Sequence, residues 1–241
     1  MREISRGRAV IAGDEAHHLT RVLRVEAGQV YEISDNSETW LAEVETARKD
    51  LVTFALHERV DTVAAVVETS LYVALVKFER IELLLEKATE LGVASVGFFT
   101  AVRSEKGLDR AAGKRSARWE RIVREASEQS RRARLPVIQP EIAFNDVLKT
   151  TARCRLMLDE REDAPPLLST LPEDPDVTDR VAVLVGPVGG WTQQERDSIR
   201  AAGWNSVSLG TTILRTETAA IAALAVINAH WGAKIAPQPV R

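Results

Sequence analysis

Two loops of the sequence combine residue types that bind ligands. The first, GPVGGW (186–191), has three glycines in its first five residues and follows the apolar run VAVLV (181–185). The second, TTILRTET (211–218), carries Arg215 and Glu217. Glycine lets a backbone approach a ligand closely, and a lone arginine at a ligand edge commonly serves an anion. The two loops therefore predict a site built from backbone groups and one cation.

Each loop also has a simpler structural interpretation. GPVGG alone is typical of a tight turn from strand to helix, and it matches neither the phosphate loop nor the dinucleotide fingerprint. Glu217 and Thr218 stand in the first turn of an apolar helix, where they would complement the helix dipole. The loops become informative only when the fold brings them together.

The elements that must position these loops alternate along the chain. Short apolar runs indicate strands buried on both faces, and the segments between them have apolar residues at helical spacing. The expected strands are 71–76, 93–99, 155–159, 181–185 and 206–210, and the expected helices are 78–92, 114–132, 147–152, 193–203 and 217–232. This alternation predicts an α/β fold, a parallel sheet with helices on both faces. Ligands bind at the carboxyl ends of such strands, so the two loops are expected to face one another.

The ends of two elements carry further signals. Gly92 is a plausible stop for the first long helix, and Thr192 with Glu195 forms a capping-box pattern at the start of another. The acidic, proline-containing segment 165–175 is expected to be a solvated surface loop.

The first 68 residues have a different pattern of apolar and polar residues. YEISD, WLAEVE and LVTFALHERV alternate between apolar and polar residues, and HHLTRVLRV fits a short helix before them. We expect a small β-rich domain over residues 1–68 and a larger α/β domain over 69–241.

The net charge of −3 conceals an uneven distribution. Residues 114–134 contain eight basic and three acidic residues, a local charge of +5, whereas 159–179 contain eight acids and one base, a local charge of −7. A basic helix of this kind suits phosphate contacts with a nucleic acid. Arg–Glu pairs three or four residues apart, such as Arg121 with Glu125, offer the alternative of a solvated helix face.

Several classes of protein are disfavoured by composition. Cys154 is the only cysteine, so an intrachain disulfide is impossible and a reducing compartment is expected. The four histidines are too scattered to suggest a metal site. The longest apolar run has nine residues, 219–227, whereas a membrane span needs about 20. The N-terminus lacks the apolar core of a signal peptide, so the cytoplasm is expected.

A family resemblance covers nearly the whole chain. It rests on the segments KFER, KATELGV, AVRSE, RWERIVREASEQSRR, VLVGPVGG and LGTTILRTETA, which occur in this order. Together they resemble the bacterial 16S ribosomal RNA uracil-N3 methyltransferases (small-subunit methyltransferase E) of the knotted SPOUT superfamily. HHLTRVLRVEAGQ is similar to the start of that family's PUA-like RNA-binding domain.

The resemblance implies a fold, a cofactor and an assembly. The α/β domain would carry a C-terminal trefoil knot, although general rules of topology argue against knots. The knot loops would bind S-adenosyl-L-methionine, and the protein would be a homodimer with the final helix in its interface. Carried onto this chain, the cofactor would be bound by Leu184, Gly186, Gly190, Leu209, Gly210, Leu214, Arg215 and Thr218.

The resemblance also implies a reaction, methylation of N3 of a uridine in 16S rRNA of the small ribosomal subunit. Arg215 would stabilise the uracil anion, and Glu217 would orient Arg215 or accept the proton, with helix capping as its alternative role. No metal is required. The RNA is expected to contact Arg24, Lys77, Arg80, Arg103, Arg118, Arg131 and Arg132.

One departure from the family pattern concerns the glycine-rich loop. The family usually has GPEGG, whereas this chain has Val188 in place of the glutamate. A carboxylate there could pair with the cofactor's amino or sulfonium group, so its loss bears on cofactor affinity. Val188 points to one rival function, an RNA-binding ribosome assembly factor with weakened catalysis. A second rival, independent of Val188, is a generic nucleotide-binding α/β enzyme. The missing phosphate motifs disfavour the latter.

Overall fold

The computed structural model describes residues 2–5, 7–60, 67–161, 163–176 and 178–232. The chain divides into two compact units, Met1–Val63 and Ala64–Arg241. The domain boundary expected after residue 68 falls at the first residue of strand β6 (Glu68–Ala74). That the two parts act as separate domains remains a prediction.

The N-terminal unit is an antiparallel sheet with one helix. Its described elements are β1 (Arg2–Ser5), β2 (Arg8–Ala12), α1 (Asp14–Arg21), β3 (Val30–Ser34), β4 (Thr39–Arg48) and β5 (Leu51–Arg59). The strand order is β1-β2-β5-β4-β3. Alternating residues of the strands, among them Val44, Val52 and Phe54, are buried with Ala16 of α1. The expected β-rich unit and its short helix are present.

The C-terminal unit is built on a six-stranded sheet in which each described pairing is parallel. The strand order is β11-β9-β10-β6-β7-β8. Its strands are β6, β7 (Ser95–Phe99), β8 (Val137–Gln139), β9 (Cys154–Leu158), β10 (Arg180–Val185) and β11 (Asn205–Val207). Its helices are α2 (Phe78–Glu90), α3 (Leu108–Ala112), the 3-10 helix η1 (Gly113–Arg115), α4 (Ser116–Gln129), α5 (Phe144–Leu148), α6 (Leu167–Thr170), α7 (Gln193–Ala201) and α8 (Thr216–Gly232).

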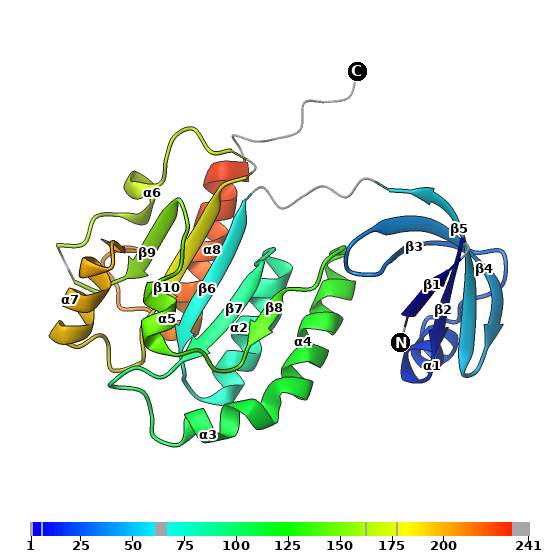
Figure 1. The fold of residues 1–241 in the computed structure, drawn as a ribbon, viewed down its shortest axis with the longest axis horizontal. Coiled ribbons are helices and arrows are strands. Elements are labelled where there is room, and N and C mark those ends of the chain that lie inside the picture. Colours follow the sequence, from blue (N-terminus) through cyan, green and yellow to red (C-terminus); the bar gives the residue numbers. More distant parts are fainter. Residues whose placement is uncertain (1, 6, 61–66, 162, 177, 233–241) are drawn as a thin grey trace. The chain divides into compact units, whose positions relative to one another are not determined.

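Helices cover both faces of this sheet (Figure 1). One hydrophobic core joins the sheet to α2, α4 and α8, through side chains such as Leu84, Trp119 and Leu224. A second core on the other face joins it to α5 and α7, through Val147 and Ile199. The expected α/β architecture with a parallel sheet is thereby confirmed.

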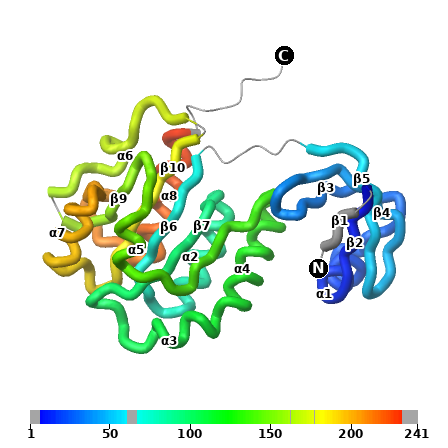
Figure 2. The backbone as a smooth tube through the Cα atoms, in the orientation of Figure 1, coloured from blue at the N-terminus to red at the C-terminus, as the bar shows by residue number. Residues whose placement is uncertain are grey.

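The last described helix, α8, runs behind the central strands β10 and β6 (Figure 2). It packs against α2, α6, β6 and β10. Ala220, Ala223, Leu224, Ile227 and Trp231 are fully buried, as expected for a helix that is apolar on most of its surface. The first turn of α8 therefore has a fixed position relative to the ends of the central strands.

Two expected helices differ from the structure. The basic helix ends at Gln129, so Arg131 and Arg132 lie beyond it, and Arg131 has a φ of +55°. The helix expected over 147–152 overlaps only the end of α5, which begins at Phe144 and ends at Leu148. Phe144 packs against Phe99 with ring centroids 5.3 Å apart.

The acidic segment 165–175 is not simply a solvated loop, and that expectation was wrong in part. It contains α6, and Leu167 and Leu171 are buried in the core. Pro166 also forms a parallel bridge with Ser208, just after β11. Apolar side chains four residues apart fasten this segment to the unit while its acids remain at the flanks.

Candidate functional site

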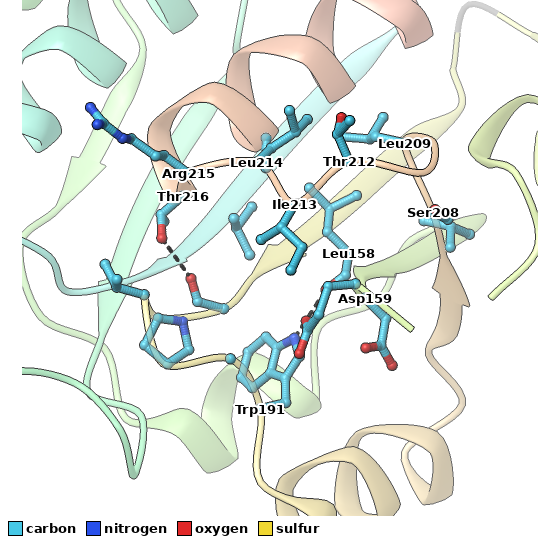
Figure 3. Close-up of a pocket in the computed structure, with 18 of the residues that line it drawn as sticks. Leu158, Asp159, Trp191, Ser208, Leu209, Thr212, Ile213, Leu214, Arg215 and Thr216 are labelled. Carbon is cyan, nitrogen blue, oxygen red and sulfur yellow. Dashed lines mark hydrogen bonds between the residues drawn. The ribbon is translucent and has the colours of Figure 1, made fainter. Parts of the chain in front are cut away.

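A cavity of about 420 Å³ lies at the carboxyl ends of β9, β10 and β11 (Figure 3). Its lining residues are 158–160, 185–191, 207–210 and 212–216, with Ala219 of α8. The two loops singled out in the sequence thus face one another across one space, as the parallel sheet predicts. We call this space the glycine cavity.

Glycines bring the backbone of the 186–191 loop close to its neighbours. A Cβ on Gly186 would lie 2.9 Å from Cε2 of Trp191. Gly190 has a φ of +66°, and a Cβ there would lie 2.6 Å from Oε1 of Glu160. Glycine is favoured at position 186 by the close approach of the Trp191 ring, and at position 190 by its positive φ.

Side chains fix the loops around the cavity. The indole of Trp191 is buried, and its Nε1 donates a hydrogen bond to the carbonyl of Leu158 at 3.0 Å (Figure 3). The hydroxyl of Thr216 donates to the carbonyl of Gly186 at 3.1 Å. These bonds join the ends of β9 and β10 to the start of α8, which makes a preformed cavity.

One wall of the glycine cavity is acidic. The carboxylate of Asp159 is fully buried and lies 3.2 Å from Nη2 of Arg196, which also lies 2.8 Å from Oε1 of Glu160. Burial alone would lower the pKa of Arg196, but the hydrogen bonds and charges of Asp159 and Glu160 raise it. The side chain of Glu160 is 39% exposed. Its carboxylate therefore remains accessible to a cationic ligand.

A second cavity, of about 210 Å³, adjoins the first and shares Pro187 and Val188 with it. We call it the basic cavity, because three cations and one acid line it. Its lining residues are Leu75, Val76, Lys77, Arg80, Arg103, Ser104, Glu105, Pro187 and Val188. An anionic ligand is the one this charge balance favours.

Arg103 ties the wall between the cavities to the loop after β7. Its Nη1 donates to the carbonyl of Gly189 at 2.9 Å. The neighbouring backbone N–H of Val102 donates to Oε1 of Glu195 at 2.8 Å, and Glu195 forms the predicted capping box with Thr192 at the start of α7. The predicted capping box is confirmed. Its Glu195 also anchors the loop after β7 by accepting the hydrogen bond from Val102.

Most of the expected cofactor residues meet at the glycine cavity. It is lined by Gly186, Gly190, Leu209, Gly210, Leu214 and Arg215. Leu184 is buried inside β10 and Thr218 is exposed on α8, and neither lines the cavity.

The two expected catalytic residues, Arg215 and Glu217, point to different surroundings. Arg215 lines the glycine cavity, but its guanidinium points away from Ile213 and Trp191 (Figure 3). Glu217 is buried, and the cation near it is Arg80, with Oε1 3.9 Å from Nε. The expected pairing of Glu217 with Arg215 is not among the interactions of the described residues.

The expected RNA-binding residues divide into groups. Lys77, Arg80 and Arg103 come together in the basic cavity. Arg24 belongs to the N-terminal unit, where it is exposed with a φ of +52°. Arg131 is exposed beyond the end of α4.

Two of these arginines already have partners within the chain. Arg118 donates to both carboxylate oxygens of Glu82, each at 2.6 Å, and these bonds raise its pKa. Arg132 donates to the carbonyls of Thr89 and Val93 at 2.9 and 2.8 Å, and burial lowers its pKa. Arg132 thus caps the end of α2, a structural role that the sequence interpretation did not foresee.

Sequence reasoning missed the acidic wall. In the sequence, Asp159 and Glu160 stand out only as members of the acidic stretch 159–179. The signal was present, because Asp159 and Glu160 directly follow a buried strand, whose carboxyl end is where ligands bind. Because both residues belong to the acidic stretch 159–179, their position at the end of a strand was not used to predict a binding role.

The described residues offer neither a metal cluster nor a membrane-spanning helix. No group of three or more His, Cys, Asp or Glu residues there is clustered as metal ligands would be. None of the described helices is both long and apolar enough to cross a membrane.

Comparison with known proteins agrees with the architecture. A family model described as an RNA methyltransferase domain matches residues 64–228, and one described as an RNA methyltransferase PUA domain matches residues 11–56. Ribosomal RNA small subunit methyltransferase E of Synechocystis sp. is 32% identical over 223 residues, which span 89% of this chain and 71% of the relative. Its counterpart from Mycobacterium tuberculosis is 31% identical over 241 residues, covering 93% of this chain and 88% of the relative.

A solved structure gives the same result. The crystal structure of a ribosomal RNA small subunit methyltransferase E from Neisseria gonorrhoeae bound to S-adenosyl methionine superposes with a TM-score of 0.84 at 27% identity, covering 96% of both chains. The resemblance drawn from the sequence motifs is confirmed. The chain belongs to the ribosomal RNA small subunit methyltransferase E family, with a PUA domain before its RNA methyltransferase domain.

Proposed function

We propose that this protein transfers a methyl group from S-adenosyl-L-methionine to N3 of a specific uridine in 16S rRNA of the small ribosomal subunit. The observation that carries the proposal is the pair of adjoining cavities. One is lined by glycines and an acidic wall, the other by three cations, and Pro187 and Val188 separate them. A cationic cofactor and an anionic substrate could thereby meet at one short wall.

The residues of the glycine cavity fit this cofactor. Close backbone at Gly186 and Gly190 suits a purine held by amide and carbonyl groups, and Leu209 and Leu214 offer apolar contact. The accessible carboxylate of Glu160 suits a positively charged amino or sulfonium group. The bound cofactor would supply an electrophilic methyl group. Leu184, buried inside β10, would support the lining from behind, and Thr218 completes the expected binding set from the exposed side of α8.

The chain's own task is to prepare uracil for attack. N3 carries a proton at neutral pH, and its loss leaves an electron pair on N3 and negative charge on the two carbonyl oxygens. That pair forms the bond to the methyl carbon while the bond from carbon to sulfur breaks. A nearby cation stabilises the anion as oxyanion-hole donors do. Arg215 and Glu217 are the sequence-based candidates for the cation and for its orienting group or proton acceptor.

The remaining expectations belong to the same proposal. The loops around the glycine cavity would form a C-terminal trefoil knot of the SPOUT type. Two copies would associate as a homodimer in the cytoplasm through surfaces that include α8. The exposed cations Arg24 and Arg131, with Lys77 in the basic cavity, would contact phosphates of the RNA. No metal takes part.

A second candidate function rests on Val188. This residue is 70% exposed on the wall between the cavities, where the family resemblance leads one to expect a glutamate. The alternative is a ribosome assembly factor that binds RNA and has lost most of its catalysis.

Two measurements test the proposal. Calorimetric titration with S-adenosyl-L-methionine in the presence of a chelator should show binding, and NAD should not compete. Small ribosomal subunits lacking the modification should then acquire one block to reverse transcription, because a methyl group on N3 prevents base pairing. Free uridine should not react. Binding of RNA without methyl transfer would favour the assembly factor, and absence of cofactor binding would contradict the proposal.

A further inference from the structure

The carboxylate of Glu217 occupies an unusual position in the first turn of α8. Its side chain is only 7% exposed, and its Oε2 has no hydrogen-bond partner among the described residues. The nearest cation is Arg80 of α2, whose Nε lies 3.9 Å from Oε1. This is an ion pair rather than a hydrogen bond. A buried carboxylate is costly unless a charge compensates it, so the neighbouring guanidinium is the feature that makes its burial tolerable.

Arg80 connects this buried carboxylate with the basic cavity. Its side chain is 28% exposed and lines the cavity together with Lys77 and Arg103. Glu217 does not line either cavity and stands behind Arg80. Nε faces Glu217, and the terminal amino groups of Arg80 have no hydrogen-bond partner among the described residues. They remain available to a ligand.

The other cations near the wall are less suited to contact a substrate from a fixed position. Arg103 is engaged by the carbonyl of Gly189. Lys77 is exposed, and no carboxylate among the described residues pairs with it. Arg215 is exposed, and its guanidinium points away from Ile213 and Trp191 of the glycine cavity (Figure 3). Arg80 alone combines partial burial, a cavity position and a buried carboxylate behind it.

We infer that Glu217 is a positioning residue for Arg80, and that Arg80 rather than Arg215 stabilises the uracil anion. This inference rests on the proposed function and names the substrate-facing cation of that site. The N3 proton leaves to water, the electron pair remains on uracil, and a terminal amino group of Arg80 donates a hydrogen bond to one carbonyl oxygen. The N3–methyl bond then forms as the methyl–sulfur bond breaks. Glu217 touches neither reactant and fixes the angle of the guanidinium.

A double-mutant cycle tests the inference at saturating RNA and cofactor. Under single-turnover conditions Arg80→Met should slow methyl transfer by about 100-fold, as for loss of one oxyanion donor. Arg80→Lys should recover only part of the rate, because an ammonium lacks the planar fork. Glu217→Gln should slow transfer by about tenfold through misplacement of Arg80. In the Arg80→Met background Glu217→Gln should cost nothing further, because the two residues act as one unit.

Two further measurements separate positioning from stability. Arg80→Met leaves the carboxylate of Glu217 buried without its cation and could therefore destabilise the fold. The double variant removes both charges, so it shows the effect on the rate without an unpaired buried charge. Cofactor affinity measured by calorimetry should change by no more than about twofold in every variant, because the glycine cavity is intact. The matched control is Lys87→Met with Glu90→Gln, an exposed pair on the same helix, which should leave the rate unchanged.

The outcomes are distinct. Glu217→Gln with an equal loss in both backgrounds would make Glu217 merely structural and overturn its positioning role. A nearly normal rate for Arg80→Met, with a large loss for Arg215→Met, would assign the cation to Arg215 and overturn the inference. Absence of methyl transfer by the unmodified protein would instead contradict the proposed function itself. A slow Arg80→Met variant of an active protein, with the predicted coupling, supports both.

Discussion

The glycine cavity and the basic cavity share Pro187 and Val188 but are built from different kinds of groups. The glycine cavity is enclosed by backbone, by a buried indole and by an acid already paired with Arg196. The basic cavity is enclosed by long charged side chains that are exposed or half-buried. The first has a shape fixed before any ligand arrives, whereas the second has a charge and an adjustable shape.

This difference predicts two kinds of mutational response. Changes in the glycine cavity should act through packing, so their effects should appear in stability and cofactor affinity and should depend little on salt. Changes in the basic cavity should act through charge, so their effects should appear in RNA binding or catalysis and should weaken as salt rises.

The largest effect on stability is expected for Arg196→Met. The change would leave the fully buried carboxylate of Asp159 without its cation, and breaking a buried pair in this way typically costs about 3–5 kcal/mol of unfolding free energy. Urea unfolding followed by circular dichroism measures it. Arg161→Met is the control, because its pair with Asp163 is exposed and should cost less than about 1 kcal/mol. Equal losses for the two variants would show that the acidic wall is not a rigid part of the cavity.

The next largest effect is expected for Gly186→Ala. Its Cβ would lie 2.9 Å from Cε2 of Trp191, and Trp191 is held by its bond to Leu158. Overpacking of this kind costs about 1–3 kcal/mol, and we expect it to appear as weaker cofactor binding in calorimetry. Gly113→Ala is the matched control, because a Cβ there meets nothing within 4 Å. Unchanged cofactor affinity in the Gly186 variant would remove this loop from the proposed binding site.

The parallel sheet and the meeting of the two loops followed from the sequence because both depend on local patterns. The apolar runs that became β6, β9 and β10 are buried on both faces, and the capping box of Thr192 and Glu195 depends on residues three apart. Such signals survive in the one-dimensional chain. The eight expected cofactor residues came from the family resemblance rather than from these patterns, and six of them line the glycine cavity.

The basic cavity and its buried carboxylate depend on contacts between residues far apart in the chain. Arg80 and Glu217 are brought together only when α8 packs on α2, and Arg103 reaches Gly189 only across the sheet. Arg132 looked like a free cation in the sequence, but its guanidinium caps α2. Charge counts predict that a surface is basic. They do not predict which of its cations already bind other groups of the same chain.

A smaller effect, expected in salt dependence, distinguishes Arg131 from Arg132. Arg131→Asn removes an exposed charge and keeps a residue that tolerates the φ of +55°. It should weaken RNA binding equally across sequences and reduce the slope of log K against log salt by about 1. Arg132→Gln should instead lower the melting temperature, because the carbonyls of Thr89 and Val93 lose their donor. The two measurements are a filter-binding titration at several salt concentrations and a thermal melt. An unchanged salt slope for Arg131→Asn would exclude this residue from the RNA surface.

The smallest effect is expected for Val188→Glu, which places a carboxylate on the wall shared by both cavities. Val188 is 70% exposed, so the longer side chain has room and its charge is partly screened. An exposed ion pair contributes at most about 1 kcal/mol, so cofactor affinity should rise by no more than about fivefold. RNA affinity should fall slightly at low salt, because the new charge partly neutralises the basic cavity. Val188→Gln is the control, since it has nearly the same size without the charge. A gain shared by both variants would mean that Val188 acts through shape, and the wall would then belong to the glycine cavity rather than to both.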